Sequence, residues 1–168
     1  MVVPRAVYPG TFDPITLGHL DILKNAVVLF DEVVVAVMHN PSKQPLFKLE
    51  ERIEMVRQAT QEWTNVSVDS FSGLLVDYYL DKGFQAVVRG IRNASDLQVE
   101  MQMAHMNEAL NPQHHTVFFP TTPKYSFVSS SLVKDVAMHG GDISQFVTPQ
   151  VNEAVRNRLG ENPFQVKR

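Results

Sequence analysis

The chain has 168 residues, which is long enough for one compact domain and too short for two. Its 15 basic and 18 acidic side chains leave a net charge of −3, which argues against a nucleic-acid-binding protein with its usual basic surface. Because cysteine is absent, disulfides, thiolate metal sites and cysteine nucleophiles are excluded. No apolar run could cross a bilayer and no signal-peptide pattern opens the chain, so we expect a cytoplasmic protein without membrane or nucleic-acid partners.

Short β-branched runs alternate with helical patterns along the sequence. Strands are expected at residues 6–8, 32–38, 66–68, 86–88 and 116–119. Helices are expected at residues 16–30, 49–63, 74–82, 96–110, 129–139 and 149–159. This alternation predicts an α/β fold: a single Rossmann-like domain over residues 1–168, with a five-stranded parallel sheet, helices on both faces and C-terminal helices.

Chemically rich segments follow all five expected strands. In parallel sheets of this kind, ligands bind beyond the carboxyl ends of the strands. The segments that come after the strands are residues 10–13, 39–43, 70–73, 89–92 and 120–131. We therefore expect one site that gathers these loops at the carboxyl edge of the sheet.

The segment PGTFDPITLGH after the first strand gives the strongest local signal. Gly10 permits a sharp turn, after which the hydroxyl and amides of Thr11 and Phe12 can face a phosphate. His19 falls in the first turn of the next helix, where the helix dipole favours an anion and an imidazole can donate to a phosphoryl oxygen. In the alternative, structural interpretation, Gly18 only allows close packing and His19 is a partly buried histidine.

Two later loops supply cations. Lys43 lies in the loop NPSKQP, whose prolines would break a helix or a central strand. Arg89 and Arg92 directly follow a buried strand, and the guanidinium group matches phosphate oxygens. Alternatively, Lys43 is a solvated loop residue and the two arginines pair at the surface with Asp96 or Glu100.

Three serines at the start of a helix offer hydroxyls and free amides to a polyphosphate. The structural interpretation is that Ser129 or Ser130 caps the helix, and both interpretations can hold together. On the preceding long helix we expect three methionines to fill the core, namely Met101, Met103 and Met106.

The remaining histidines suggest no metal site. His114 and His115 lie in a loop without partners at a ligand spacing, so we expect no metal held by the protein. A dinucleotide-dependent oxidoreductase is also disfavoured, because the sequence has neither G-x-G-x-x-G nor a P-loop.

Taken together, these motifs resemble the nucleotidyltransferase superfamily that has an (H/T)xGH signature, here TLGH at residues 16–19. Within that superfamily the chain resembles the phosphopantetheine adenylyltransferases, because it has Thr16 in place of the usual histidine. The strings that carry this resemblance are PGTFDPIT, PSK, FKLEER, RGIR, EMQMAHMN and YSFVSSS. This resemblance implies transfer of AMP from ATP to 4′-phosphopantetheine, giving dephospho-coenzyme A and pyrophosphate. Direct attack of the substrate phosphate, without a covalent enzyme intermediate, is the implied mechanism.

The resemblance also implies a role for individual residues, with His19 as the transition-state stabiliser. The implied pantetheine-substrate residues are Thr11, Lys43, Leu75 and Arg89. The implied ATP residues are Thr11, Phe12, His19, Gly90, Ile91, Arg92, Glu100, Tyr125, Ser126, Phe127, Val128, Ser129, Ser130 and Ser131. The resemblance further implies that Mg²⁺ accompanies ATP, that the protein is a homohexamer and that coenzyme A is a candidate inhibitor.

Two alternatives stay open at this point. One is another nucleotidyltransferase of the superfamily that acts on a different phosphate, such as nicotinate mononucleotide; Thr16 and the PSK loop argue against it. The other is a non-catalytic sensor of adenine nucleotides or coenzyme A on the same fold. The presence of all the cations suited to transition-state charge argues against a sensor.

Overall fold

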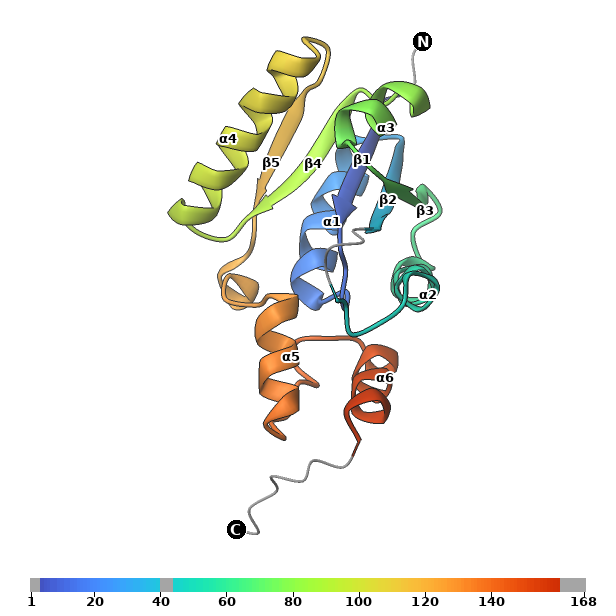
Figure 1. Cartoon of the computed structure of the whole chain (residues 1–168), viewed down its shortest axis with the longest axis vertical. Helices are drawn as coiled ribbons and strands as arrows, with labels where there is room; N and C mark the ends of the chain where they lie inside the picture. The colour runs from blue at the N-terminus through green and yellow to red at the C-terminus, as the bar shows by residue number, and fades with distance from the viewer. Residues whose placement is uncertain (1–3, 40–43, 161–168) are drawn as a thin grey trace.

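The computed structural model describes residues 4–39 and 44–160, and Lys43 therefore lies outside the described residues. Five parallel strands form one sheet in the order β3-β2-β1-β4-β5, with helices on both faces (Figure 1). The strands are β1 Arg5–Gly10, β2 Glu32–His39, β3 Val66–Ser72, β4 Ala86–Ile91 and β5 Thr116–Pro120. The helices are α1 Leu17–Leu29, α2 Leu49–Thr60, α3 Leu75–Lys82, α4 Ala94–Leu110, the 3-10 turn η1 Pro123–Tyr125, α5 Ser130–Met138 and α6 Pro149–Leu159. The expected fold class and all the expected strands and helices are confirmed.

The central strands have a buried core on each side. Successive side chains of a strand point to opposite faces, so β2 sends Val33, Val35 and Val37 to one core and Val34 and Ala36 to the other. The larger core takes buried residues from α1, α2, α5 and α6, and the smaller core takes buried residues from α3. Burial on both faces explains why this strand is an almost continuous apolar run.

Element boundaries differ from expectation at several places. Strands β1, β2 and β3 run to Gly10, His39 and Ser72, past their expected ends. Helix α2 ends at Thr60, because two successive turns lead from it into β3. The Trp63 N–H to the Thr60 carbonyl closes the first turn, and the Val66 N–H to the Trp63 carbonyl closes the second. Strand β4 continues through Arg89 to Ile91, whose backbone pairs with β5. The expectation that Arg89 begins a loop is therefore wrong, and only Arg92 comes after the strand.

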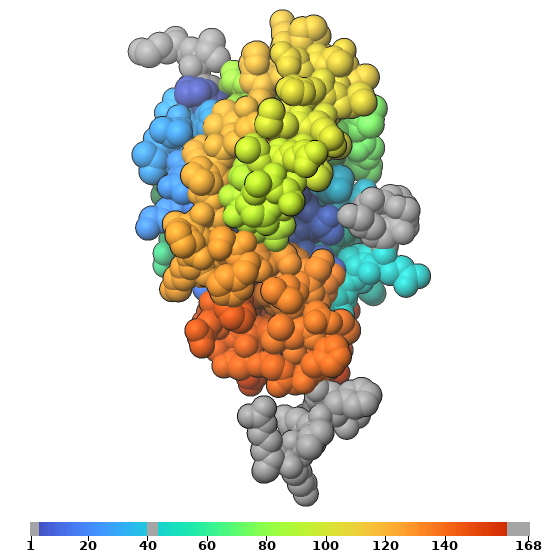
Figure 2. Space-filling model, turned by 90° about the vertical axis from the view of Figure 1, so that its left-hand side faces the viewer, coloured from blue at the N-terminus to red at the C-terminus, as the bar shows by residue number. Residues whose placement is uncertain are grey.

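Helix α4 lies against β4 and α3 with no buried residue, and it occupies much of the face seen in Figure 2, coloured yellow to yellow-green. Met101, Met103 and Met106 are 41%, 53% and 59% exposed. The expectation that they fill the core is wrong. Apolar residues are spread around this helix rather than along one stripe, so one contact with the sheet cannot cover them.

None of the helices in residues 4–39 and 44–160 combines the length and the apolar character needed to cross a membrane.

Candidate active site

Two cavities open at the carboxyl edge of the sheet. The first cavity, of about 310 Å³, lies between the start of α1, the end of β4 and the start of α5. The second cavity, of about 280 Å³, lies between the end of β3, the start of α3 and α4. The residues that line both are Pro9, Gly10, Arg89 and Glu100. The two cavities thus meet at an arginine-carboxylate pair.

His19 faces the first cavity as a neutral donor. The Thr16 N–H donates to His19 Nδ1 over 3.0 Å, so Nδ1 is the acceptor and the ring proton lies on Nε2. Burial, and after it the charges of Arg92 and Arg89, lower the pKa of His19 to about 4, which leaves the imidazole neutral near pH 7. The ring also packs edge-on against Phe12, with 5.0 Å between centroids. His19 is therefore both a capping-box residue of α1 and a lining residue of the cavity.

The turn after β1 is made at Phe12 rather than at Gly10. Gly10 still belongs to β1, whereas Phe12 has a φ of 47°, in the left-handed region that few non-glycine residues occupy. Gly10 is needed for another reason, because a Cβ there would lie 2.9 Å from the Phe12 ring. Phe12 lines the first cavity, while Thr11 lines neither.

Arg89 and Glu100 form the wall between the cavities. Arg89 Nε and Nη2 donate to Glu100 Oε2 and Oε1, each over 2.6 Å, and Nη1 donates to the Pro9 carbonyl over 3.1 Å. Although burial opposes the charge, the Glu100 carboxylate raises the pKa of Arg89 above its usual value. A fixed guanidinium group is therefore exposed to both cavities.

Arg92, three residues after Arg89, makes a similar pair with a carboxylate. Its Nε donates to Asp96 Oδ2 over 2.6 Å, and both residues line the first cavity. The pairing of Arg89 and Arg92 with Glu100 and Asp96 is therefore confirmed, but not the open surface position that the alternative gave it. These pairs lie in the cavity walls, however, so pairing and anion binding are compatible uses of the two arginines.

Gly90 lets α1 approach β4 closely. A Cβ at this position would lie 2.8 Å from Ile22 Cγ1, in the buried face of α1. Gly90 lines the first cavity and Ile91 does not. This glycine thus brings the first turn of α1, with His19, next to Arg89 of β4 and to Arg92 just after it.

All three serines of the expected motif line the first cavity, and two also have structural contacts. Ser129 caps α5, its Oγ accepting from the Leu132 N–H over 3.1 Å, and the Ser130 hydroxyl donates to the Pro14 carbonyl over 2.8 Å. Of the other expected residues in this run, Val128 lines the first cavity. The ones that do not are Tyr125, Ser126 and Phe127.

The second cavity has a largely apolar wall. Leu74 and Leu75 contribute to it from the start of α3, and Met103 contributes from α4. Leu75, which the resemblance implies for the pantetheine substrate, therefore lies in the wall of the second cavity together with Arg89.

Three charged residues behind the first cavity were not singled out from the sequence. They are Asp13 of the first loop, Arg52 of α2 and Lys134 of α5. Asp13 and Arg52 stand inside the strings GTFDP and FKLEER. The partners of Asp13 lie 33 to 121 residues away, and the bond from Arg52 to the first loop spans 41 residues, so neither gives a local signal.

The described residues do not fit a metal held by the protein alone. No group of three Asp, Glu, His or Cys side chains in the described ranges could hold an ion. The carboxylates at the first cavity, Asp96 and Glu100, are already bonded to arginines.

Comparisons with known proteins agree with this geometry. The sequence profile of the cytidylyltransferase-like family matches residues 7–136, which defines the class of the domain. A phosphopantetheine adenylyltransferase from Heliobacterium modesticaldum is 52% identical over 156 residues, covering 93% of each chain. The chain therefore belongs to the phosphopantetheine adenylyltransferases, within the cytidylyltransferase-like family.

A solved structure of low sequence identity supports the fold. It is titled as a putative nicotinate-nucleotide adenylyltransferase from Vibrio parahaemolyticus, with a TM-score of 0.67 and 18% identity over 95% of this chain and 98% of that one. At this identity the likeness concerns the fold and not the substrate.

Proposed function

We propose that this chain is an enzyme of coenzyme A biosynthesis that transfers AMP from ATP to 4′-phosphopantetheine, giving dephospho-coenzyme A and pyrophosphate. The observation that carries the proposal is the meeting of two cavities at Arg89. One cavity has the donors that a nucleotide phosphate needs, and the other has the apolar wall that a pantetheine arm needs. The family membership supports the same reaction.

ATP is assigned to the first cavity. The start of α5 with Ser129 to Ser131 offers hydroxyls and helix N-terminal amides to the phosphates, and Arg92 adds a guanidinium group. The neutral His19 ring is fixed through Nδ1, and its Nε2–H would donate to the α-phosphoryl group. Of the remaining ATP residues that the resemblance implies, Phe12, Gly90, Glu100 and Val128 also line this cavity. Because Thr11, Ile91, Tyr125, Ser126 and Phe127 line neither cavity, their contacts with ATP rest on the resemblance alone.

4′-Phosphopantetheine is assigned to the second cavity, with its phosphate at Arg89. Leu75 and Met103 would pack on the pantetheine arm, and the Arg89 fork would hold the phosphate at the boundary with the first cavity. Glu100 keeps that fork oriented in the free protein. Lys43, outside the described residues, is proposed to hold the same phosphate.

The reaction needs no general base. A phosphate oxygen of the substrate attacks the α-phosphorus of ATP, the bond from that phosphorus to the bridging oxygen breaks, and pyrophosphate leaves with the bonding electrons. A phosphate dianion is already a nucleophile, so the protein contributes position and electrostatic stabilisation.

Mg²⁺ is proposed to come with ATP, bound to its phosphates and neutralising the charge of the leaving pyrophosphate. The lack of a three-ligand cluster among the described residues is compatible with such a substrate-carried ion. Removing Mg²⁺ with a chelator should therefore abolish turnover while leaving the thermal stability of the protein unchanged.

We further propose a cytoplasmic homohexamer with coenzyme A as an inhibitor. The support for assembly is the exposed apolar surface of α4, including Val99, Met106 and Leu110. Light scattering should give six times the 19.0 kDa mass of the chain, and a monomer would refute the assembly.

The experiment that tests the function is a substrate panel. With ATP and Mg²⁺, 4′-phosphopantetheine should give dephospho-coenzyme A, identified by mass spectrometry, together with stoichiometric pyrophosphate. Nicotinate mononucleotide should give no product. Product from nicotinate mononucleotide alone would select the other nucleotidyltransferase, and absence of any pyrophosphate would select the sensor.

A further inference from the structure

Charged residues behind the first cavity join segments that are far apart in sequence. Asp13 is 3% exposed, and its two carboxylate oxygens accept the N–H groups of Leu46 and Phe47, each over 2.9 Å. Lys134 Nζ of α5 donates to the same carboxylate over 2.7 Å. The first loop, the segment before α2 and the helix α5 thus meet at one carboxylate.

Arg52 of α2 is the counterpart of Asp13. It is 2% exposed and makes no direct ion pair within the part of the chain that the structure describes. Its guanidinium donates instead to three backbone carbonyls: Nη1 to Thr11 over 2.6 Å and to Met38 over 3.0 Å, and Nε to Phe47 over 3.2 Å. One arginine therefore connects the chain after β1, the end of β2 and the start of α2.

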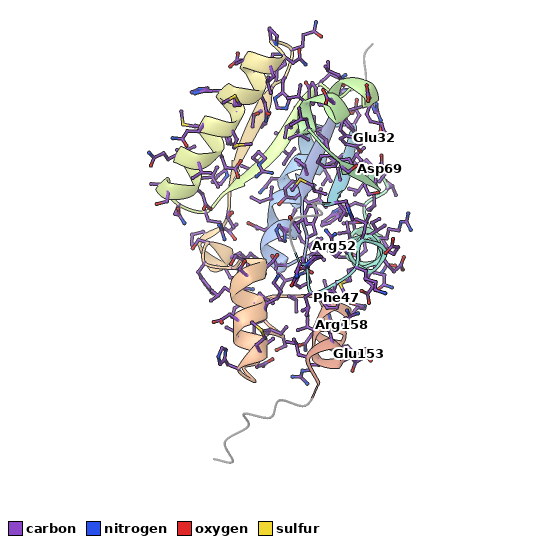
Figure 3. The ribbon with its side chains drawn as sticks, viewed as in Figure 1. Glu32, Phe47, Arg52, Asp69, Glu153 and Arg158 are labelled. Atoms are coloured by element: carbon purple, nitrogen blue, oxygen red, sulfur yellow. The ribbon has the colours of Figure 1, made fainter. Side chains whose placement is uncertain are left out.

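Side chains bond to every backbone polar group of Leu46 and Phe47. The Asp13 carboxylate accepts from both N–H groups. Arg52 donates to the Phe47 carbonyl, and Arg158 of α6 donates to the Leu46 carbonyl over 3.0 Å. In Figure 3, Arg52, Phe47 and Arg158 lie one below another between α2 and α6. This dipeptide is outside regular secondary structure, so charged side chains fix its position.

The bond from Arg52 to Thr11 also sets the direction of the next amide. In a planar trans peptide the carbonyl and the N–H point in opposite directions, so the Phe12 N–H points away from Arg52. No acceptor for this N–H is found among the described residues. Phe12 has a φ of 47°, and such a conformation persists where surrounding contacts determine it, here the Arg52 bond and the packing of the Phe12 ring.

We infer that Arg52 is a positioning residue, which holds the Thr11–Phe12 peptide against the ends of β1 and β2 so that the Phe12 amide donates to a phosphate of the nucleotide more strongly in the transition state than in bound ATP. The inference rests on the proposed function. Arg52 does not line either cavity and acts through the loop.

The test is Arg52→Lys, assayed for AMP transfer. Lysine keeps the charge but lacks the planar fork, so it cannot satisfy three carbonyls in the same geometry. Since small displacements of reacting groups cost up to about 100-fold, kcat should fall about 10- to 100-fold, with the Kd for ATP within about three-fold of wild type. Val56→Ala is the matched control, because Val56 is buried on α2 one turn later and contacts the core instead of the loop. It should lower Tm comparably and leave kcat within about two-fold.

Each outcome decides the inference. If Arg52→Lys loses no more turnover than Val56→Ala, or if its loss is entirely in ATP affinity, the positioning role is refuted. If Arg52→Lys does not fold, Arg52→Gln takes its place, and failure of both to fold would make Arg52 a folding residue and overturn the inference. An inactive wild type would instead refute the proposed function, so the two failures are distinguishable.

Discussion

At the scale of single residues, one ring nitrogen of His19 caps the start of α1 and the other belongs to the first cavity. Nδ1 accepts from the Thr16 N–H, which closes the capping box of α1, and this bond leaves the proton on Nε2. Burial and two neighbouring arginines keep the ring neutral. The structural and functional interpretations of this histidine are therefore both needed, and a variant must be tested for each.

His19→Ala should fold, bind ATP within a few-fold of wild type and lose turnover. If Nε2–H donates mainly to the α-phosphoryl group in the transition state, its removal should lower kcat by about 10²- to 10³-fold. Steady-state kinetics and ATP binding by calorimetry check this.

Loss of the capping contact in His19→Ala should also cost about 1 kcal/mol of stability. Thr148→Ala, which removes a cap of α6, is the control for that cost and should keep full activity. A His19→Ala protein with near-normal turnover would leave the histidine only its structural role.

The buried ring of His114 should make the folded protein less stable at acid pH. The ring is buried against Tyr79, both its nitrogens lack a partner among the described residues, and burial lowers its pKa below the usual 6.5. Below about pH 6.5 the unfolded chain therefore binds a proton that the folded protein resists, so stability falls as pH falls. Burial lowers the pKa of His19 as well, and its effect has the same sign.

His114→Phe should make the free energy of unfolding less dependent on pH. Urea unfolding at pH 7 and pH 5 measures the difference, which should be smaller in the variant than in wild type because the contribution of His114 is removed while that of His19 is retained. An equal or steeper pH dependence in His114→Phe would show that the buried ring is not the cause.

At the scale of elements, the site depends on how closely α1 packs on β4. Gly90→Ala would place a methyl group 2.8 Å from Ile22 Cγ1, and overpacking of a buried contact costs about 1–3 kcal/mol. Because the same displacement moves the helix turn that carries His19, turnover should fall as well. Urea unfolding and kinetics of Gly90→Ala, Ile22→Ala and the double variant form the check. The double variant should be less destabilised than the sum of the two single variants, and simple additivity would contradict this contact.

Local patterns predicted the elements because they depend on neighbouring residues. The apolar run of β2 indicates a strand by itself, and Ser129 before α5 indicates a helix cap by its position next to the helix. The end of β4 could not be predicted in this way, because Arg89 to Ile91 become strand only by pairing with β5. The exposure of Met101, Met103 and Met106 was missed for a related reason, since burial depends on what lies across from the helix.

At the scale of the whole molecule, the sequence predicted which loops form the site but not how they are held. Gathering of loops at the carboxyl edge follows from parallel topology, and His19, Arg89 and Arg92 lie there. The contacts that fix those loops, such as Asp13 to Phe47 and Arg52 to Thr11, connect residues dozens of positions apart. The division of the site into two cavities that meet at Arg89 likewise appears only when the chain is folded.

The central claim is that AMP passes directly between two ligands that meet at Arg89. The measurement that tests it most directly is the stereochemistry at the α-phosphorus, followed with ATP made chiral there by oxygen isotopes or sulfur substitution and with 4′-phosphopantetheine as acceptor. One in-line displacement should give dephospho-coenzyme A with inverted configuration at that phosphorus. Retention would require an adenylylated protein group such as His19 and would contradict direct transfer, and failure to form dephospho-coenzyme A at all would contradict the account as a whole.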